Sequence, residues 1–358
     1  MSTDAEQSLA DFFFPEDNGV LQAPETFSHW VERNHWAISM FEPSMHGAVG
    51  PEVELQRGEL KRRVINLSSY NYMGLATHPE VVEAGRQALL EYGTGACGSP
   101  LLSGKMKLHV ELEQRLSAFL GREDTMLFNS GFGGGMGSLA GILRKGDAAI
   151  LDEKCHLCLI DGVKLSKAKL VFFRHNDPES LDEALKATEG RRRLVVVEGV
   201  YSMDGDTADL PKLLPVAEQH KVGMFIDEAH SILVFGENGR GVIEHYGVAD
   251  RVGLQFATFS KSFASCGGFT SGSKRLIDYM RFYSNAYGFS CALPPVVVGG
   301  LLKALEVVSR DNSLREKLWT NTRYFHEQAH SLGLNLGHAN SQVFPIIIGS
   351  NRQMLYEL

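Results

Sequence analysis

LQFATFSK, residues 254–261, joins an apolar run to a lysine that stands among small and hydroxyl residues. A second apolar run, Val222–Ile226, ends in the same way at Asp227-Glu228-Ala229-His230. Short continuous apolar runs are typical of strands in a sheet that is covered on both faces. Because ligands of parallel sheets sit beyond the carboxyl ends of the strands, both stretches are expected to contribute to a functional site.

The same pattern recurs along the chain, where short apolar runs alternate with segments of helical length and periodicity. The predicted strands are Thr125–Phe128, Ala148–Leu151, Leu170–Phe173, Leu194–Val197, Val222–Ile226, Leu254–Ala257 and Phe269–Ser271. The predicted helices are Lys105–Leu120, Gly133–Leu143, Glu179–Ala187, Pro211–His220 and Lys274–Tyr287. This alternation predicts an α/β fold with a mainly parallel, doubly wound sheet.

Three parts are expected along the chain. Residues 1–60 are predicted to be an N-terminal arm, and residues 61–294 to form the large domain. Residues 295–358 are predicted to hold the helices Val296–Ser309 and Ser313–Leu332 and the strand Val343–Ile348, and to end at Leu358 inside another helix. One strand and two helices make a poor free-standing domain, so we expect a small C-terminal domain that is incomplete here.

Composition narrows the classes of function. The chain has 358 residues with 44% hydrophobic and 22% charged residues and a net charge of -8, which is the balance of a globular protein with no bulk attraction to nucleic acid or anionic lipid. No run is long enough for a membrane-spanning helix, and the acidic N-terminus does not read as a signal peptide. A cytoplasmic enzyme is the expectation.

Lys261, Asp227 and His230 are the parts that a pyridoxal phosphate enzyme needs from its protein. A lysine amine can form a Schiff base when burial or nearby positive charge lowers its pKa. A carboxylate such as Asp227 can keep the pyridine nitrogen protonated, which makes the ring a better electron sink. His230 can reach the ring hydroxyl or a substrate carbonyl. Taken singly, Lys261 can equally be a surface lysine, and Asp227 a strand end before a helix cap.

A glycine-rich turn supplies a candidate phosphate site. Ser130-Gly131-Phe132-Gly133-Gly134-Gly135 follows a predicted strand and opens a helix, where free backbone amides bind phosphate. The hydroxyls of Thr258 and Ser260 can donate to the same phosphate. The overlapping match of residues 135–140 to the dinucleotide pattern G-x-G-x-x-A falls inside the predicted helix, so a nicotinamide dehydrogenase is a weaker alternative.

Three further polar residues follow strands or lie in turns. His156 comes after the strand Ala148–Leu151, where its ring can stack on a cofactor, although a structural histidine is an equal interpretation. Asn71 and Ser202 are in turn-like settings, and taken alone they are accounted for by turn chemistry. Beside the other residues, Asn71 is a candidate substrate-binding residue and Ser202 a candidate cofactor-binding residue. Cys155-His156-Leu157-Cys158 resembles a metal or redox motif, but no second cluster supplies the further ligands that zinc needs.

Many ordered stretches together resemble the α-oxoamine synthase family of pyridoxal phosphate enzymes, from about Val64 to Ile348. Those on the N-terminal side are Asn71–Leu75, Gly93–Gly95, Ser103-Gly104, His109–Glu113, Ser130–Phe132 and Asp152–Gly162. Those on the C-terminal side are Tyr201–Gly205, Asp227–Ser231, Gly236–Gly241, Thr258–Lys261 and Phe289-Ser290.

The resemblance implies the type I aminotransferase fold and a homodimer with shared active sites. It implies that Lys261 carries the cofactor, that Asp227 pairs with the pyridine nitrogen and that His156 stacks on the ring. It also implies that His230 bonds the ring hydroxyl. The phosphate would be held by the amides of Gly131 and Phe132, by Thr258 and by Ser290 of the partner subunit.

The implied reaction is a decarboxylative condensation of an amino acid with an acyl thioester, which gives an α-amino ketone. Lys261 would act first as cofactor anchor and then as the base that removes the α-proton. Another type I enzyme, such as an aminotransferase or an aldol-type lyase, is the runner-up. A non-catalytic partner subunit of the same fold is a further alternative.

Three departures concern the substrate side. Pro100 stands where many members have an arginine, which favours an acyl carrier protein over CoA as the thioester carrier. Cys158 stands where a serine is usual, and the family arginine that binds the substrate carboxylate would lie beyond Leu358. Ser99 takes the place of a threonine found in members that use glycine, so alanine or a larger amino acid is expected.

Overall fold

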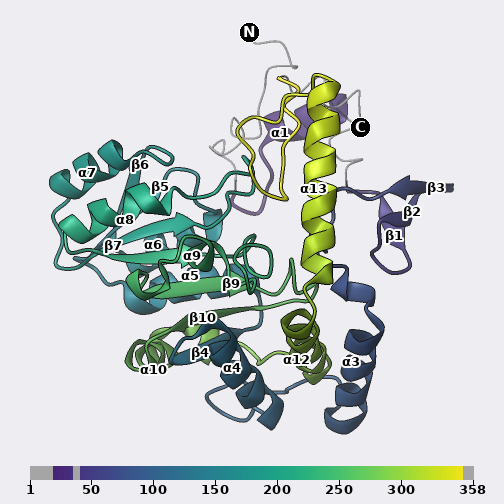
Figure 1. The fold of residues 1–358 in the computed structure, drawn as a ribbon, viewed down its shortest axis with the longest axis horizontal. Coiled ribbons are helices and arrows are strands. Elements are labelled where there is room, and N and C mark those ends of the chain that lie inside the picture. The colour runs from purple at the N-terminus through teal and green to yellow at the C-terminus, as the bar shows by residue number, and fades with distance from the viewer. Residues whose placement is uncertain (1–18, 35–40, 350–358) are drawn as a thin grey trace. The chain divides into compact units, whose positions relative to one another are not determined.

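The computed structural model describes residues 19–34 and 41–349 (Figure 1). Its helices are α1 (Glu25–Arg33), α3 (Pro79–Tyr92), α4 (Lys107–Leu120), α5 (Gly131–Ile142), α6 (Leu157–Ser166), α7 (Pro178–Ala187), α8 (Leu210–Gln219), α9 (Val242–His245), α10 (Lys274–Tyr283), α11 (Asn285–Gly288), α12 (Pro295–Arg310) and α13 (Ser313–Ser331). Its strands are β1 (Ser44–His46), β2 (Glu52–Arg57), β3 (Leu60–Ile65), β4 (Asp124–Phe128), β5 (Ala148–Asp152), β6 (Lys169–Phe173), β7 (Arg193–Glu198), β8 (Gly223–Asp227), β9 (Leu254–Thr258) and β10 (Gly268–Gly272).

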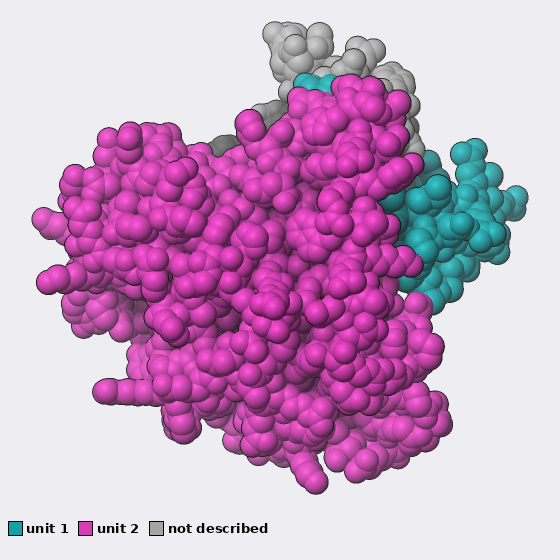
Figure 2. All heavy atoms as spheres, in the orientation of Figure 1, with its two compact units in different colours: residues 1–68, 348–358 teal, residues 69–347 magenta. Residues whose placement is uncertain are grey.

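The chain forms two compact units, which Figure 2 shows in different colours. One comprises residues 1–68 and 348–358, and its described part contains α1 and the antiparallel sheet β1-β2-β3. This sheet was not predicted, because residues 1–60 were interpreted as an arm. The other unit, residues 69–347, contains all the remaining elements. The two units do not divide at residue 294, so the expected boundary there stays a prediction.

The seven strands predicted for the large domain form one sheet in the order β4-β10-β9-β8-β7-β5-β6. The pairs β6–β5, β5–β7, β7–β8 and β8–β9 are parallel, and β10 runs antiparallel to both of its neighbours. The expected mainly parallel sheet is therefore confirmed. Since β10 reverses direction between β9 and β4, the carboxyl ends of β4 and β9 lie at the same edge of the sheet.

Alternate residues of the strands belong to two separate apolar clusters. Ile150, Val195 and Ile226 pack with residues of α4, α7, α8 and α12 on one face of the sheet. Leu151 and Phe225 pack with residues of α5, α6 and α10 on the other face. Because successive side chains of a strand point to opposite faces, both faces are buried, and continuous apolar runs are the result.

The C-terminal part differs from the prediction in two places. The predicted helix Lys274–Tyr287 is interrupted at Ser284, whose φ of -87° and ψ of 103° are extended, so that α10 and α11 are separate helices. The predicted strand Val343–Ile348 is wrong, because no strand forms in the described residues there. Phe344 instead stacks on Phe325 of α13, with ring centroids 4.2 Å apart, so side-chain packing rather than a strand ladder holds this segment.

The helix predicted to follow residue 348 lies outside the described residues. The helices Val296–Ser309 and Ser313–Leu332 are confirmed as α12 and α13, and α12 packs on α3 and α4. In the described part of the chain, none of the helices combines the length and the apolar character needed to cross a membrane.

Candidate active site

Three polar side chains lie at the carboxyl ends of adjacent parallel strands. Glu198 ends β7 and pairs in register with Asp227, which ends β8, and Thr258 ends β9. By the alternation along each strand, all three point to the face covered by α5 and α6, since Phe225 and Phe256 lie in the apolar cluster of that face. The N-termini of α5 and α6 follow β4 and β5 at the same edge of the sheet, so the site is assembled there.

Lys261 follows β9 by three residues and lies within electrostatic reach of Asp227 and Glu198. Burial lowers the pKa of Lys261, while the two carboxylates act in the opposite direction. Burial also raises the pKa of Asp227 and of Glu198, and the charge of Lys261 lowers both. An amine with a lowered pKa is more often neutral, and only the neutral amine is a nucleophile or a base.

The turn before α5 packs directly on the end of β9. Ser130 caps α5, and its Oγ accepts a hydrogen bond of 2.9 Å from the Gly133 amide. A Cβ on Gly131 would lie 2.4 Å from Thr258 Oγ1 and 3.0 Å from Thr258 Cβ, so only glycine allows this approach. The hydroxyls of Thr258 and Ser260 are 2.6 Å apart. Hydroxyl groups and the free amides at the N-terminus of α5 therefore lie close together. Hydrogen-bond donors grouped in this way bind an anion such as phosphate.

The dinucleotide-like pattern at residues 135–140 lies within α5. A Cβ on Gly137 would lie 2.6 Å from Ala286 Cβ, and one on Gly135 would lie 2.7 Å from Cys158 Sγ. These glycines allow α11 and α6 to pack closely on α5. The fingerprint requires them in the turn before a helix, so the pattern has a packing role here.

His156 caps α6 and lies next to the glycine-rich turn that begins α5. Its Nδ1 accepts a hydrogen bond of 3.3 Å from the Cys158 amide and lies 3.0 Å from Cys158 Sγ. Its backbone amide donates to Glu198, and its ring contacts Phe132 edge to face, with ring centroids 6.2 Å apart. Burial, and then the charge of Lys261, lowers the pKa of His156. A neutral, exposed ring thus lies beside the amine and the glycine turn.

His230 is almost fully buried, with 4% of its surface exposed, and is held by two residues from distant parts of the chain. Its Nδ1 lies 2.8 Å from the hydroxyl of Tyr72, and its backbone oxygen accepts a hydrogen bond of 2.7 Å from Gln342 Nε2. Burial, together with the charges of Lys261 and His156, lowers the pKa of His230 well below its ordinary value.

Four further predicted site residues lie in turns and loops, and Asn71 is the first of them. Asn71 Oδ1 accepts a hydrogen bond of 3.3 Å from the Ala76 amide, which is the turn role considered above. Ser202 follows Tyr201 in the connection between β7 and α8, and Ser290 follows α11. Their roles at the site stay predictions, and that of Ser290 requires the partner subunit.

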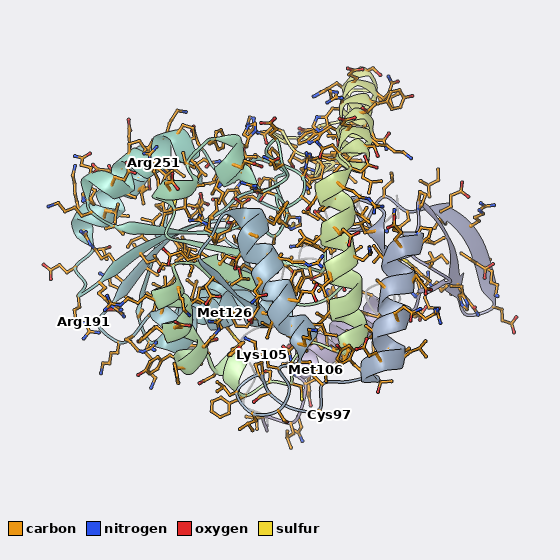
Figure 3. The ribbon with its side chains drawn as sticks, turned by 60° about the horizontal axis from the view of Figure 1, so that its bottom comes forward. Cys97, Lys105, Met106, Met126, Arg191 and Arg251 are labelled. Carbon is orange, nitrogen blue, oxygen red and sulfur yellow. The ribbon has the colours of Figure 1, made fainter. Side chains whose placement is uncertain are left out.

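Ser99 is the fourth of these residues. It lies in the loop between α3 and α4 that Cys97, Lys105 and Met106 flank in Figure 3. Its Oγ is buried and finds no hydrogen-bond partner among the described residues. The loop is closed by the Gly104 amide, which donates to Ser99 O at 2.9 Å, and Lys105 Nζ anchors it to Glu113 on α4 at 2.6 Å.

Three residues join the site without having been predicted for it. Glu198 comes directly after the predicted strand Leu194–Val197, and this position at a strand end, like that of Asp227, was the available signal. Tyr72 lies inside the stretch Asn71–Leu75, in which only Asn71 was considered as a site residue. Gln342 could not have been found from the sequence, because it directly precedes a segment that was predicted to be a strand. In the structure this segment is coil, and Gln342 reaches His230.

The residues present fit pyridoxal phosphate. A buried amine and a buried carboxylate lie within electrostatic reach of each other, and a cradle that a Cβ would fill lies at the N-terminus of a helix. This set would bind an aldehyde, a ring nitrogen and a phosphate at the same time. Among the described residues, by contrast, no three His, Cys, Asp or Glu side chains are grouped for a metal ion.

Comparison with known proteins gives consistent results. The aminotransferase class I and II family matches residues 62–357. An 8-amino-7-oxononanoate synthase of Thermoanaerobacter pseudethanolicus is 38% identical over 82% of this chain and 75% of its own length. A serine palmitoyltransferase of Sphingobacterium spiritivorum is 37% identical over 82% of this chain and 74% of its own length.

Solved structures agree. A serine palmitoyltransferase from S. paucimobilis, solved with a bound PLP–myriocin aldimine, superposes with a TM-score of 0.87 at 31% identity, over 94% of this chain and 88% of that one. The predicted type I fold and the predicted relationship to acyl-transferring synthases are thereby confirmed. The chain belongs to the aminotransferase class I and II family.

Proposed function

We propose that this protein is a pyridoxal phosphate-dependent acyltransferase that condenses an amino acid with an acyl thioester, releases carbon dioxide and yields an α-amino ketone. The observation that carries the proposal is the convergence of Lys261, Asp227 and the Gly131–Thr258 cradle at one edge of the sheet. The relatives named as 8-amino-7-oxononanoate synthase and serine palmitoyltransferase support this reaction class.

Each residue of the group has a task that follows from its surroundings. When bound, pyridoxal phosphate supplies a protonated ring that accepts electron density from the α-carbon of the amino acid. Lys261 would hold the cofactor covalently and, once released, would take the α-proton, for which its lowered pKa suits it. Asp227 would keep a proton on the ring nitrogen, and its buried position excludes water from that ion pair.

The remaining residues would bind and orient. The amides of Gly131 and Phe132, with the hydroxyl of Thr258, would hold the phosphate at the N-terminus of α5. The ring of His156 would cover the cofactor from the α6 side, where Glu198 fixes the backbone of the histidine. His230 would donate a hydrogen bond to an oxygen of the cofactor or of the substrate.

A homodimer with shared active sites is part of the proposal. Leu101, Leu102 and Phe289 are 48%, 87% and 84% exposed. The loop and α11 adjoin, because the Ala292 amide donates to Gly98 O at 2.9 Å and a Cβ on Gly288 would lie 2.8 Å from Leu101 Cδ1. Adjoining exposed apolar side chains of this size are typical of a protein interface. Ser290 directly follows this surface, as a residue shared with the partner's site would.

The proposal extends to the acyl carrier, the amino acid and the location. Pro100 brings no positive charge to the substrate side, which favours an acyl carrier protein over CoA as carrier. Ser99 favours alanine or a larger amino acid over glycine. The cytoplasmic location stays a prediction.

The cofactor anchor is tested by borohydride reduction of the protein mixed with pyridoxal phosphate. Mass spectrometry should find the pyridoxyl group on the peptide that contains Lys261, and the variant Lys261→Ala should lose both this label and the absorbance of the bound cofactor. Lys303→Ala, which removes an α12 lysine paired with Glu306 at 2.8 Å, is the control and should keep both. A label at another lysine, or no label at all, would contradict the proposal.

The reaction is tested by product analysis. Amino acids and acyl thioesters, as acyl-CoA and as acyl carrier protein, should together release carbon dioxide, and neither substrate alone should do so. Formation of a 2-oxo acid without carbon dioxide would instead identify an aminotransferase, and aldehyde release without a thioester would identify a lyase.

A further inference from the structure

Tyr72 and His230 make a side-chain contact across a long separation in sequence. The Tyr72 hydroxyl lies 2.8 Å from His230 Nδ1, and the two residues are 158 positions apart. Their ring centroids are 6.3 Å apart at an interplanar angle of 44°, so the hydroxyl approaches the ring nitrogen from the side rather than from above the ring. Tyr72 also lies in the stretch Asn71–Leu75, whose backbone turns are closed by the Gly74 amide donating to Asn71 O at 3.0 Å.

Gln342 sets the direction of this hydrogen bond. Its Nε2 donates to the backbone oxygen of His230 at 2.7 Å, which identifies this end of the side chain as the nitrogen. Gln342 also lowers the pKa of the Tyr72 phenol, as a donor beside the hydroxyl does, but burial raises that pKa by more and keeps the phenol protonated. A protonated phenol that faces an amide donor has its own proton left for His230 Nδ1.

We propose that Tyr72 is a positioning residue that donates its hydroxyl proton to His230 Nδ1 and so fixes the imidazole as the neutral tautomer with its proton on Nε2. A neutral imidazole carries one proton, and an Nδ1 that accepts leaves that proton on Nε2. Within the described residues, Nε2 of His230 makes no hydrogen bond. The ring therefore offers a donor to the site.

The chemical consequence rests on the proposed function. The oxygens that His230 would meet there, a ring hydroxylate or a substrate carbonyl that gains negative charge, need a hydrogen-bond donor. The other tautomer would direct a lone pair at the same oxygen and repel it. The groups that face His230 are Lys261, His156, Tyr70 and Tyr72. Of these four described residues, only Tyr72 hydrogen-bonds to the imidazole, so the position of the imidazole proton depends on it.

The tautomer is measured directly by ring-nitrogen NMR on full-length protein labelled at histidine, with and without pyridoxal phosphate. His230→Gln assigns the resonances. In the unaltered protein, Nδ1 of His230 should resonate as an unprotonated nitrogen and Nε2 as a protonated one. Tyr72→Phe should give a mixture of the two tautomers. Tyr70→Phe is the matched control, because the Tyr70 ring also contacts His230 edge-on, with centroids 6.2 Å apart, and it should leave the resonances unchanged.

Turnover gives the second measurement. Tyr72→Phe should lower kcat by about 10-fold, the value of one lost hydrogen bond, with little change in KM for the amino acid. A protonated Nδ1 in the unaltered protein overturns the inference even if Tyr72→Phe does not fold, and so does an unchanged tautomer in that variant. Failure of the proposed function is a separate result, because it would appear as the lack of a cofactor label on Lys261 while the NMR result on the cofactor-free protein stands.

Discussion

Gly131 shows how one missing side chain can make room for a ligand. The position lies at the first turn of α5, against Thr258, and any Cβ there would meet the Thr258 hydroxyl at 2.4 Å. Since Thr258 Oγ1 also lies 2.9 Å from Gly267 O, its side chain is held from behind and cannot move away freely. The free amides of the helix and the threonine hydroxyl thus depend on the same glycine.

Gly131→Ala should therefore weaken the binding of pyridoxal phosphate by about 5- to 150-fold, because relieving the overlap costs roughly 1–3 kcal/mol and displaces Thr258. The binding of pyridoxal, which lacks the phosphate, should change much less. A titration of both compounds by absorbance measures the two dissociation constants. Gly223→Ala, where a Cβ meets nothing within 4 Å, is the control. If the affinities for pyridoxal phosphate and for pyridoxal fell equally, the substitution would not act at the phosphate site.

At the scale of elements, one buried ion cluster joins three loops beside the site. His175, which follows β6, lies 3.0 Å from Asp152 at the end of β5 and 2.8 Å from Asp206 in the connection between β7 and α8. Burial lowers the pKa of His175, but the hydrogen bonds and charges of the two aspartates outweigh it and raise the pKa to about 9. The imidazolium is the form that holds the loops together.

This cluster predicts how stability depends on pH. The pKa of His175 is above the ordinary value of 6.5 in the folded state, so its contribution is fully present below about pH 6.5 and is lost as the pH rises through about 9. The loss amounts to about 3 kcal/mol in the free energy of unfolding. Urea unfolding of the cofactor-free protein between these two pH values measures it.

His175→Gln should flatten this decline. Lys154→Met, which removes the neighbouring ion pair with Asp204, is the control and should leave the slope in this window unchanged, because it removes no histidine. An equally steep decline in His175→Gln would show that another group is responsible.

At the scale of the whole molecule, the exposed apolar surface of Leu101, Leu102 and Phe289 predicts a dimer. In sedimentation velocity, the unaltered protein should have about twice the 39.5 kDa mass of the chain. Phe289→Asp should shift it toward the monomer and reduce cofactor binding, because a buried, unpaired charge opposes association. Leu332→Asp changes a residue that is 76% exposed next to α13 and serves as control. A dimeric Phe289→Asp variant would contradict this assignment of the interface.

The amount of structure that could be predicted differs between the two compact units. The seven strands of the large sheet were predictable because burial on both faces leaves continuous apolar runs. The strands β1, β2 and β3 were missed because most of their residues are exposed or half-buried, and their sequences carry no such run. The segment 343–348 was assigned to a strand because it is apolar, whereas it has no partner strand and its Phe344 stacks on Phe325 of α13.

Lys261 and Asp227 together, each just beyond an apolar run, determined the class of chemistry from the sequence. An amine and a carboxylate just beyond two apolar runs predict both a parallel sheet and a cofactor at its edge. The reason is that the carboxyl ends of parallel strands lie at the same edge of the sheet, where ligands bind. Only the tertiary structure decided how the histidine beside them is held. Tyr72 and Gln342 reach His230 across 158 and 112 positions, and hydrogen bonds of a few ångströms between such distant residues have no local pattern in the sequence.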